Sequence, residues 1–270
     1  MAKADSVVVG SLDESFHRVV AAVIARVLNR LGHETVPVVG MHEEMYARLG
    51  RGEIHLFADA WLPHSQGHLW EKVRDRAVEV TQLYAGARYF WAVPCYVSAS
   101  EIDDIGDLAD PDLAMDMATQ EIIGAPAGSG LSRWSAQVVS AYGLDRACWT
   151  YRAADVPTII RTIEQRMSAG DWFVTPLWVP QYLDDVFDLR RLEDPLRVFP
   201  PADRASLVAY RERFDQLPGA TRGVLQRIRL DLCDVSEMDA AVNLDGLSPA
   251  EAAKEWLDHN DAQLRAWLKA

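Results

Sequence analysis

Apolar and polar residues in the first part of the chain switch between two periods, one typical of strands and one typical of helices. Runs of apolar, β-prone residues predict three short strands, at 6–9, 36–39 and 53–59. Between the first two, apolar residues at helical spacing predict a helix that ends at Gly32, with Asp13 and Ser15 as candidate N-caps. A short helix is expected at 43–49. This alternating order favours a parallel sheet covered by helices.

The middle of the chain opens in the same way, with a strand, a glycine turn and a helix. Strands are expected at 79–97, 121–124, 148–152 and 172–177, and helices at 131–142 and 154–167. Polar, proline-marked joins near 94–98 and 190–195 indicate two crossovers between lobes. We therefore expect an α/β protein of two lobes, a discontinuous one formed by 1–96 plus 194–270 and a second one formed by 97–193.

The part of the chain after Pro195 is expected to be helical. Helices are predicted at 202–214, 220–232, 236–243 and 248–268. The last one has the clearest start signal, because Ser248 can cap it, Pro249 fits the first helical position and Glu251 the third.

Charge and composition exclude several classes of function. The chain has 270 residues and a formal net charge of −13, and no basic face for a nucleic acid is visible. No apolar run is long enough to cross a membrane. The first residues, MAKADSVVVG, lack the regions of a signal peptide, so two expectations stay open: an extracytoplasmic mature chain, periplasmic or membrane-anchored, or a cytoplasmic protein.

Cysteine usage gives no sign of a metal site or a disulfide framework. Cys95, Cys148 and Cys233 are far apart, and their spacing does not match a metal-binding pattern. We expect all three to be small buried residues.

Tryptophan is the most informative residue type. The chain has nine tryptophans, and Trp61 and Trp178 fall just beyond the ends of predicted strands, where α/β proteins bind ligands. Aromatic faces are the groups that hold a quaternary ammonium, which forms no ordinary hydrogen bonds. Four other tryptophans are expected to be core residues: Trp149, Trp172, Trp256 and Trp267.

The glycine-rich turn at 124–130 is a candidate anion site. It lies directly before a predicted helix, whose first backbone N–H groups point toward the turn and carry partial positive charge. The turn matches neither a dinucleotide-binding motif nor a P-loop. A purely structural turn is the alternative.

Several of these segments together resemble the substrate-binding proteins of glycine betaine/choline-type ABC importers. The matching segments are D-A-W-L-P at 59–63 with Trp70 beyond it, V-P-x-Y at 93–96, the glycine turn from Gly124 to Leu131, W-x-P at 178–180 and L-x-x-L-E-D-P at 189–195. The resemblance covers almost the whole chain.

The resemblance implies a two-lobed fold of the type II periplasmic-binding-protein kind, with parallel-rich sheets, flanking helices and the ligand in the cleft between lobes. It makes Trp61 and Trp178 walls of an aromatic cage. It also implies that the backbone amides of Gly130 and Leu131, next to Ser129, bind the ligand carboxylate. The implied ligand is a compatible solute such as glycine betaine, choline, carnitine or a similar amine. The implied partner is the membrane subunit of an ABC importer, and we expect a monomer, with no cofactor, no metal and no enzymatic activity.

The sequence departs from the family pattern at two places. Members of the family often have a third cage tryptophan in the first strand–helix turn, and here that position falls near Leu12. In the same turn, Asp13 or Glu14 could add a carboxylate near the cation or simply cap the helix. A histidine common five residues after the first tryptophan is replaced by Gln66, with His64 close by. These departures favour a ligand that differs from glycine betaine, such as a bulkier amine.

Two other classes of function are alternatives. His64 and His68 with Asp59 nearby could hold a metal, but a solvated loop is the simpler interpretation, and no hydrolase motif is present. A cytoplasmic ligand sensor on the same fold is the remaining alternative, supported by the missing signal peptide.

Overall fold

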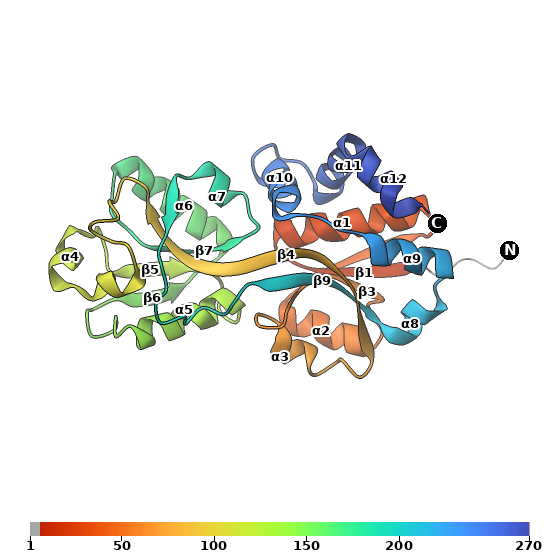
Figure 1. Cartoon of the computed structure of the whole chain (residues 1–270), viewed down its shortest axis with the longest axis horizontal. Helices are drawn as coiled ribbons and strands as arrows, with labels where there is room; N and C mark the ends of the chain where they lie inside the picture. The colour runs from red at the N-terminus through yellow and green to blue at the C-terminus, as the bar shows by residue number, and fades with distance from the viewer. Residues whose placement is uncertain (1–5, 270) are drawn as a thin grey trace. The chain divides into compact units, whose positions relative to one another are not determined.

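The computed structural model describes residues 6–269, with the side chains of residues 114, 115, 184 and 185 outside the description. The chain forms two compact units (Figure 1). Unit 1 contains residues 6–87, Pro180–Tyr182 and 202–269 of the described chain, and unit 2 contains Arg88–Val179 and Leu183–Pro201.

Unit 1 is built on a mixed sheet with the strand order β2-β1-β3-β9-β4. The strands are β1 (Val7–Leu12), β2 (Thr35–Gly40), β3 (Leu56–Leu62), β9 (Asp203–Tyr210) and the first part of β4 (Ala77–Pro94). As predicted, β1 pairs in parallel with both β2 and β3. Strand β9 is antiparallel to both of its neighbours, β3 and β4.

Helices cover both faces of this sheet. The helices are α1 (Ser15–Arg30), α2 (His42–Gly50), α3 (Gly67–Trp70), α8 (Arg211–Gln216), α9 (Gly219–Arg227), α10 (Leu232–Asn243), α11 (Pro249–His259) and α12 (Asp261–Leu268). Figure 1 shows α1 with α10 and α11 on one face and α2 with α3 on the other. The apolar residues of α1 are buried between the sheet and helices α10 and α11, as their helical spacing predicts.

The predicted helix at 202–214 is wrong, because most of this segment is strand β9. The middle of β9, from Ala205 to Ala209, is fully buried between β3 and β4. Backbone pairing on both sides outweighs the helix propensity of its alanines, a tertiary effect that local sequence does not show. The helix begins only at Arg211.

Two predictions about helix ends have different outcomes. The start of α11 is confirmed: Ser248 accepts a hydrogen bond from the amide of Glu251 in a capping box, and Pro249 is the first helical residue. The cap predicted for α1 is wrong, since Glu14 is the N-cap and makes no side-chain cap bond. The single helix predicted at 248–268 is interrupted at Asn260.

Unit 2 combines a parallel pair of strands with an antiparallel ribbon. β5 (Glu121–Gly124) pairs in parallel with β6 (Thr150–Ala153), and the second part of β4 pairs in antiparallel fashion with β7 (Thr175–Val179) and β8 (Leu189–Arg191). Its helices are a short 3-10 turn (Ile105–Ala109), α4 (Pro111–Asp116), α5 (Gly130–Ala141), α6 (Val156–Ala169) and α7 (Leu183–Val186).

Two tryptophans, Trp91 and Trp149, belong to the core of unit 2. Trp91 is fully buried and donates from Nε1 to Ser135 Oγ at 3.0 Å, and Trp149 donates from Nε1 to the carbonyl of Leu108 at 2.7 Å. The predicted core role of Trp149 is confirmed, whereas Trp172 is only half-buried. In unit 1, Trp256 and Trp267 are buried and stacked at 6.2 Å, as expected of core residues.

Each predicted crossover segment begins at the end of a strand, since β4 ends at Pro94 and β8 at Arg191. Residues 88–92 of β4 pair with β7, and β8 pairs with the end of β4, so both predicted crossovers, 94–98 and 190–195, fall inside unit 2. The chain changes units at 87/88 and 201/202, and briefly at 180–182. The predicted lobe boundaries, 96/97 and 193/194, remain a prediction about which residues move as one body.

The prediction of buried cysteines is wrong. Cys95, Cys148 and Cys233 are all exposed and free. Cys95 and Cys148 lie in turns, and Cys233 lies on the outer face of the first turn of α10. Among the described residues, no helix has the length and apolar character needed to cross a membrane.

Candidate functional site

Trp178 lies inside a strand, not on the loop that follows it. Strand β7 runs to Val179, and Pro180 comes directly after its end. The prediction of a loop position is therefore wrong. The strand begins at Thr175 instead of 172 and ends two residues later than predicted, so it includes Trp178. The side chain of Trp178 is buried, with 6% of its surface exposed.

Tyr89 is the partner of Trp178 across the ribbon. The two residues lie directly opposite each other in the antiparallel pairing of β4 and β7. Directly opposed residues project from the same face of a sheet, with Cβ atoms about 5 Å apart. The ribbon therefore presents two aromatic side chains side by side.

The ring of Tyr89 reaches the start of helix α5. A Cβ atom placed on Gly130 would lie 3.0 Å from Tyr89 Cζ and even closer to the tyrosine hydroxyl. Gly130 is the first residue of α5, and any side chain there would have to push the Tyr89 ring aside. Trp178, Tyr89 and the first turn of α5 thus form one continuous candidate site in unit 2.

The first turn of α5 has the chemistry of an anion site. Ser129 is the N-cap, and its side chain accepts a hydrogen bond from the amide of Ser132 at 3.2 Å. The amides of Gly130 and Leu131 precede the first intrahelical hydrogen bond of α5, as in every α-helix. The side chain of Leu131 is buried, so its backbone is held in place by packing.

Trp61 also lies inside a strand. Strand β3 ends at Leu62, and Trp61 pairs with Ala205 of β9. The ladder has an irregularity between Phe57 and Ala60, and Asp59 there has a φ of 69°. Aspartate is among the few residues that tolerate this left-handed conformation. Sequence alone placed Trp61 beyond the strand because it does not reveal this bulge.

A buried polar network surrounds the indole of Trp61. Its Nε1 donates to Asp59 Oδ1 at 3.3 Å and to the hydroxyl of Tyr84 at 3.1 Å. Asp59 is fully buried, and its Oδ2 lies 2.7 Å from Nδ1 of His17. Burial, together with the charge and hydrogen bond of Asp59, raises the pKa of Tyr84 well above its ordinary value. Tyr84 therefore remains protonated and available as a donor.

Two further aromatic rings contact Trp61. The ring centroids of Phe16 and His17, both on the first turn of α1, lie 5.6 Å and 5.8 Å from that of Trp61. The helix start that follows β1 thus supplies aromatic rings to this cluster, although a tryptophan is missing from the turn itself.

Leu12 and Asp13 occupy very different environments. Leu12 is fully buried in the main hydrophobic cluster of unit 1, with Tyr46 and Leu62 among its members. Asp13 is exposed, and its carboxylate lies 3.8 Å from the guanidinium of Arg18. Glu14 is half-buried, and burial raises the pKa of its carboxyl group. The expected ligand contacts of Leu12 and Asp13 stay predictions.

His64 belongs to a loop that a single carboxylate holds. Asp203, which is buried, accepts hydrogen bonds from the amide of His64 at 2.7 Å, the amide of Ser65 at 2.9 Å and Ser65 Oγ at 2.5 Å. Gln66 is buried and accepts a hydrogen bond from the hydroxyl of Tyr46 at 2.9 Å. Gln66 therefore has a structural partner on the side of the core.

The structure gives no support to a metal at the histidines. No group of three or more His, Cys, Asp or Glu side chains in the described part of the chain is arranged to hold a metal ion. His68 is exposed, whereas Asp59 is fully buried.

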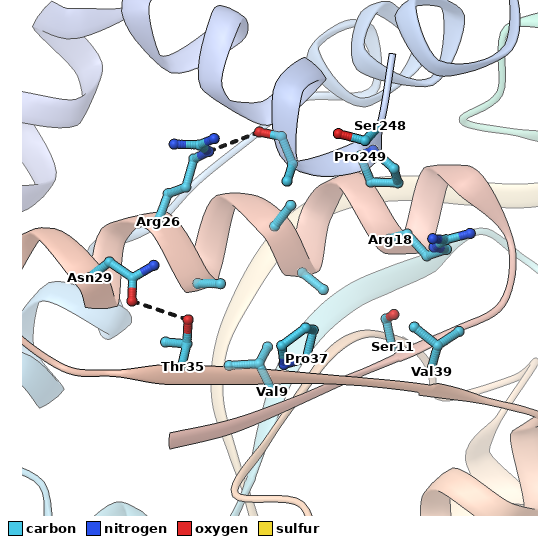
Figure 2. Close-up of a pocket in the computed structure, with 14 residues that line it drawn as sticks. Val9, Ser11, Arg18, Arg26, Asn29, Thr35, Pro37, Val39, Ser248 and Pro249 are labelled. Atoms are coloured by element: carbon cyan, nitrogen blue, oxygen red, sulfur yellow. Dashed lines mark hydrogen bonds between the residues drawn. The ribbon is translucent and has the colours of Figure 1, made fainter. Parts of the chain in front are cut away.

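A pocket of about 490 Å³ lies elsewhere in unit 1, between α1, β1, β2 and the start of α11 (Figure 2). Arg26 donates there to the carbonyl of Ala250, and Thr35 donates to Asn29. The described residues that line it include no aromatic ring, and its cations are Arg18 and Arg26. Two guanidinium groups repel an ammonium ion, so this pocket is a poor match for a quaternary amine.

Sequence reasoning missed Tyr89, Phe16, His17 and Tyr84. Tyr89 stood in a predicted strand rich in aromatic residues, and the register that pairs it with Trp178 has no local signal. His17 could have been predicted as a site residue, because it follows Phe16 at the start of a predicted helix beyond the first strand.

Comparison with known proteins identifies the family of this chain. The family model for the substrate-binding domain of ABC-type glycine betaine transport systems matches residues 5–259. The glycine betaine/carnitine transport binding protein GbuC of Listeria monocytogenes serotype 1/2a (strain 10403S) is 28% identical over 163 residues, 59% of this chain and 54% of the relative. The match thus spans about half the length of that relative.

Three solved structures share the fold, and their low identities make this a likeness of fold alone. Lactococcal OpuAC, closed and complexed with glycine betaine, has a TM-score of 0.86 at 17% identity, over 98% of this chain and 99% of its own. ProX of Borrelia burgdorferi has a TM-score of 0.85 at 18% identity, over 98% and 97%. An ABC-transporter choline-binding protein in complex with choline has a TM-score of 0.82 at 22% identity, over 97% and 91%. The predicted type II fold is confirmed, and the family match over residues 5–259 shows that the chain belongs to the substrate-binding domains of ABC-type glycine betaine transport systems.

Proposed function

We propose that this protein binds a small quaternary amine, such as glycine betaine, choline or carnitine, and delivers it to the membrane subunit of an ABC importer. The observation that carries the proposal is the pairing of Tyr89 with Trp178 next to the first turn of α5. Family membership agrees with it, because the family consists of transport binding domains and not of enzymes.

The aromatic side chains account for the cationic end of the ligand. A quaternary ammonium carries methyl groups and no N–H, so it gains most from aromatic faces, each worth about 0.5–2 kcal/mol. Unit 2 offers Trp178 and Tyr89, and unit 1 offers Trp61 with Phe16 beside it. Each unit thus offers aromatic faces of the kind that hold a quaternary ammonium.

The start of α5 accounts for a carboxylate end. Backbone N–H groups in the first turn of a helix bind anions through hydrogen bonds and the helix dipole. The amides of Gly130 and Leu131 are in this position, and Ser129 caps the same turn. A zwitterion with its ammonium at the rings and its carboxylate at α5 satisfies both groups. Choline has no carboxylate, so with choline bound the α5 amides would donate their hydrogen bonds to water.

The likeness to both a betaine-bound and a choline-bound structure leaves several amines open. The absence of a tryptophan in the turn after β1 favours a ligand with more bulk than glycine betaine. We place the protein on the extracytoplasmic side of the membrane, where substrate-binding proteins of this family act, and as a monomer. A cytoplasmic sensor on the same fold is less favoured.

Calorimetric titration with glycine betaine, choline and carnitine tests the proposal, with L-proline and L-lysine as ligands that carry no quaternary ammonium. The proposal predicts saturable binding of at least one quaternary amine, weakened on the order of 5- to 150-fold in Trp178→Ala, the scale of 1–3 kcal/mol. Trp256→Phe, in the core of unit 1 and at the stacked pair, is the matched control and should bind normally. Binding of lysine in preference to all three amines would refute the proposal.

A further inference from the structure

Burial of the Asp59 side chain costs free energy. It is fully buried, and a buried carboxylate loses hydration that only hydrogen bonds or a positive charge can replace. Its left-handed backbone, with a φ of 69°, could be adopted equally well by asparagine or glycine. The backbone therefore does not explain why a carboxylate occupies this bulge in β3.

The hydrogen-bond partners of the carboxylate suggest its role. Trp61 Nε1 donates to Oδ1 at 3.3 Å, and His17 Nδ1 lies 2.7 Å from Oδ2. The hydroxyl of Tyr84 is the third group, hydrogen-bonded to Asp59 and 3.1 Å from the same indole nitrogen. All three partners converge on the carboxylate from different elements, α1, β3 and β4, so its position is fixed by packing on each side.

This arrangement fixes the indole of Trp61. The ring can rotate about its side-chain bonds only by giving up a hydrogen bond to a buried charge, which is among the stronger hydrogen bonds in proteins. A negative charge at the N–H edge also increases the electron density of the ring face. A cation in front of that face is attracted by both the ring and the carboxylate behind it.

We propose that Asp59 is a positioning residue that acts through Trp61, orienting the indole and strengthening its attraction for a positively charged ligand. The inference rests on the proposed function, since it assumes that Trp61 faces the quaternary ammonium. His17 and Tyr84 hold the carboxylate in place. Four further titratable groups interact electrostatically with His17, Asp59 or Tyr84: Glu14, His42, Tyr46 and Asp239. Burial raises the pKa of the Glu14 and Asp239 carboxyl groups.

Asp59→Asn tests the charge with little change of shape, because asparagine also tolerates a left-handed backbone. The probes are glycine betaine and its uncharged-headgroup isostere 3,3-dimethylbutanoate, and choline with 3,3-dimethylbutan-1-ol. We expect the substitution to weaken binding of the cations on the order of tenfold, the scale of one desolvated cation–π contact, and to leave the isosteres unchanged. Asp215→Asn, at an exposed carboxylate of the same unit, is the control for loss of a negative charge. An equal loss for cation and isostere, or no loss for either, overturns the inference.

A double-mutant cycle shows whether Asp59 acts through the indole. In a Trp61→Phe background there is no indole N–H, so Asp59→Asn should reduce cation affinity less than it does with Trp61 present, because only the direct attraction between carboxylate and cation remains. The same loss in both backgrounds would contradict a role through Trp61. If the wild type binds none of the quaternary amines, the proposed function fails, whereas normal binding that Asp59→Asn does not change is a failure of this inference alone.

The ligand-free wild type provides a readout that depends neither on ligand binding nor on the folding of Asp59→Asn. The indole ¹⁵N–¹H resonance of Trp61, assigned by its disappearance in Trp61→Phe, should lie downfield of the exposed-indole position and exchange slowly with solvent. A resonance at the position of a solvent-exposed indole would show that the hydrogen bond to the carboxylate is absent and would overturn the inference.

Discussion

The ring of Tyr89 occupies the space that any side chain at Gly130 would need, with its Cζ 3.0 Å from where a Cβ would be. This contact joins the β4–β7 ribbon to the start of α5. It brings an aromatic ring, the partner of Trp178, to the helix terminus that we propose for a carboxylate.

Gly130→Ala should therefore damage the site more than the fold. The added methyl group has to displace Tyr89 or the first turn of α5, and such overpacking costs about 1–3 kcal/mol. We expect weaker amine binding by calorimetry and a smaller loss when Tyr89→Phe, which removes the closest atom, is combined with it. Gly219→Ala, where no atom lies within 4 Å, is the control and should change neither binding nor melting. Unchanged affinity in Gly130→Ala would contradict the proposed use of this turn.

Tyr89 itself should contribute to affinity through its ring. Tyr89→Ala removes one aromatic face, so amine binding should weaken by about 1–2 kcal/mol, whereas Tyr89→Phe should cost less. The neighbouring residue Arg88 is exposed on the same strand and points to the other face, which makes Arg88→Ala the matched control. Equal affinity of Tyr89→Ala and wild type would remove Tyr89 from the proposed cage.

Asp203 should be important for stability because it holds the loop after Trp61. In Asp203→Asn the amide group faces the N–H groups of His64 and Ser65, and lost hydrogen bonds in a buried place cost about 1–3 kcal/mol. Urea unfolding measures this loss. Asp215→Asn, an exposed aspartate, should stay within about 0.5 kcal/mol of wild type. A similar midpoint for both variants would show that the Asp203 contacts add nothing.

His42 should make the protein less stable in mild acid. Burial, and after it the charges of His17 and His68, lower the pKa of His42 from 6.5 to about 4. Because the folded pKa is lower than the unfolded one, this contribution is fully present above pH 6.5 and is lost as the pH falls toward 4. Between pH 7 and pH 5, wild type should lose about 1–2 kcal/mol more than His42→Gln in urea unfolding.

The comparison with His42→Gln is needed because other groups titrate in the opposite direction. Glu14 and Asp239 have raised pKa values, so their contribution to stability is lost as the pH rises. Subtracting the free energy of unfolding of His42→Gln from that of the wild type at each pH removes the contributions of Glu14 and Asp239. Identical pH dependence of the two proteins would contradict the buried, uncharged state of His42.

The elements that the sequence predicted well are those with strong local signals. The alternation in the first part of the chain predicted β1, α1, β2 and α2, and Ser248 with Glu251 predicted the start of α11. The helix predicted at 202–214 failed, because β9 owes its conformation to pairing with β3 and β4. A strand between two others depends on residues far away in the chain, which no local window contains.

The candidate site was predictable in part for the same reason. Motifs identified Trp61, Trp178 and the glycine turn, but both tryptophans were placed beyond strands that in fact include them. Tyr89 became visible only through the register of β4 and β7. The role of Asp59 depends on a bulge and on contacts from three elements, and neither is encoded by spacing.

We propose above all that the aromatic rings recognise a positive charge and not merely an apolar shape. Calorimetric titration of the wild type with choline and with 3,3-dimethylbutan-1-ol, and with glycine betaine and 3,3-dimethylbutanoate, measures this difference directly. If two rings contact the ammonium, at least one cation should bind on the order of 10- to 100-fold more tightly than its isostere. Equal affinity for cation and isostere would contradict the account, because it would make the rings a hydrophobic pocket without preference for charge.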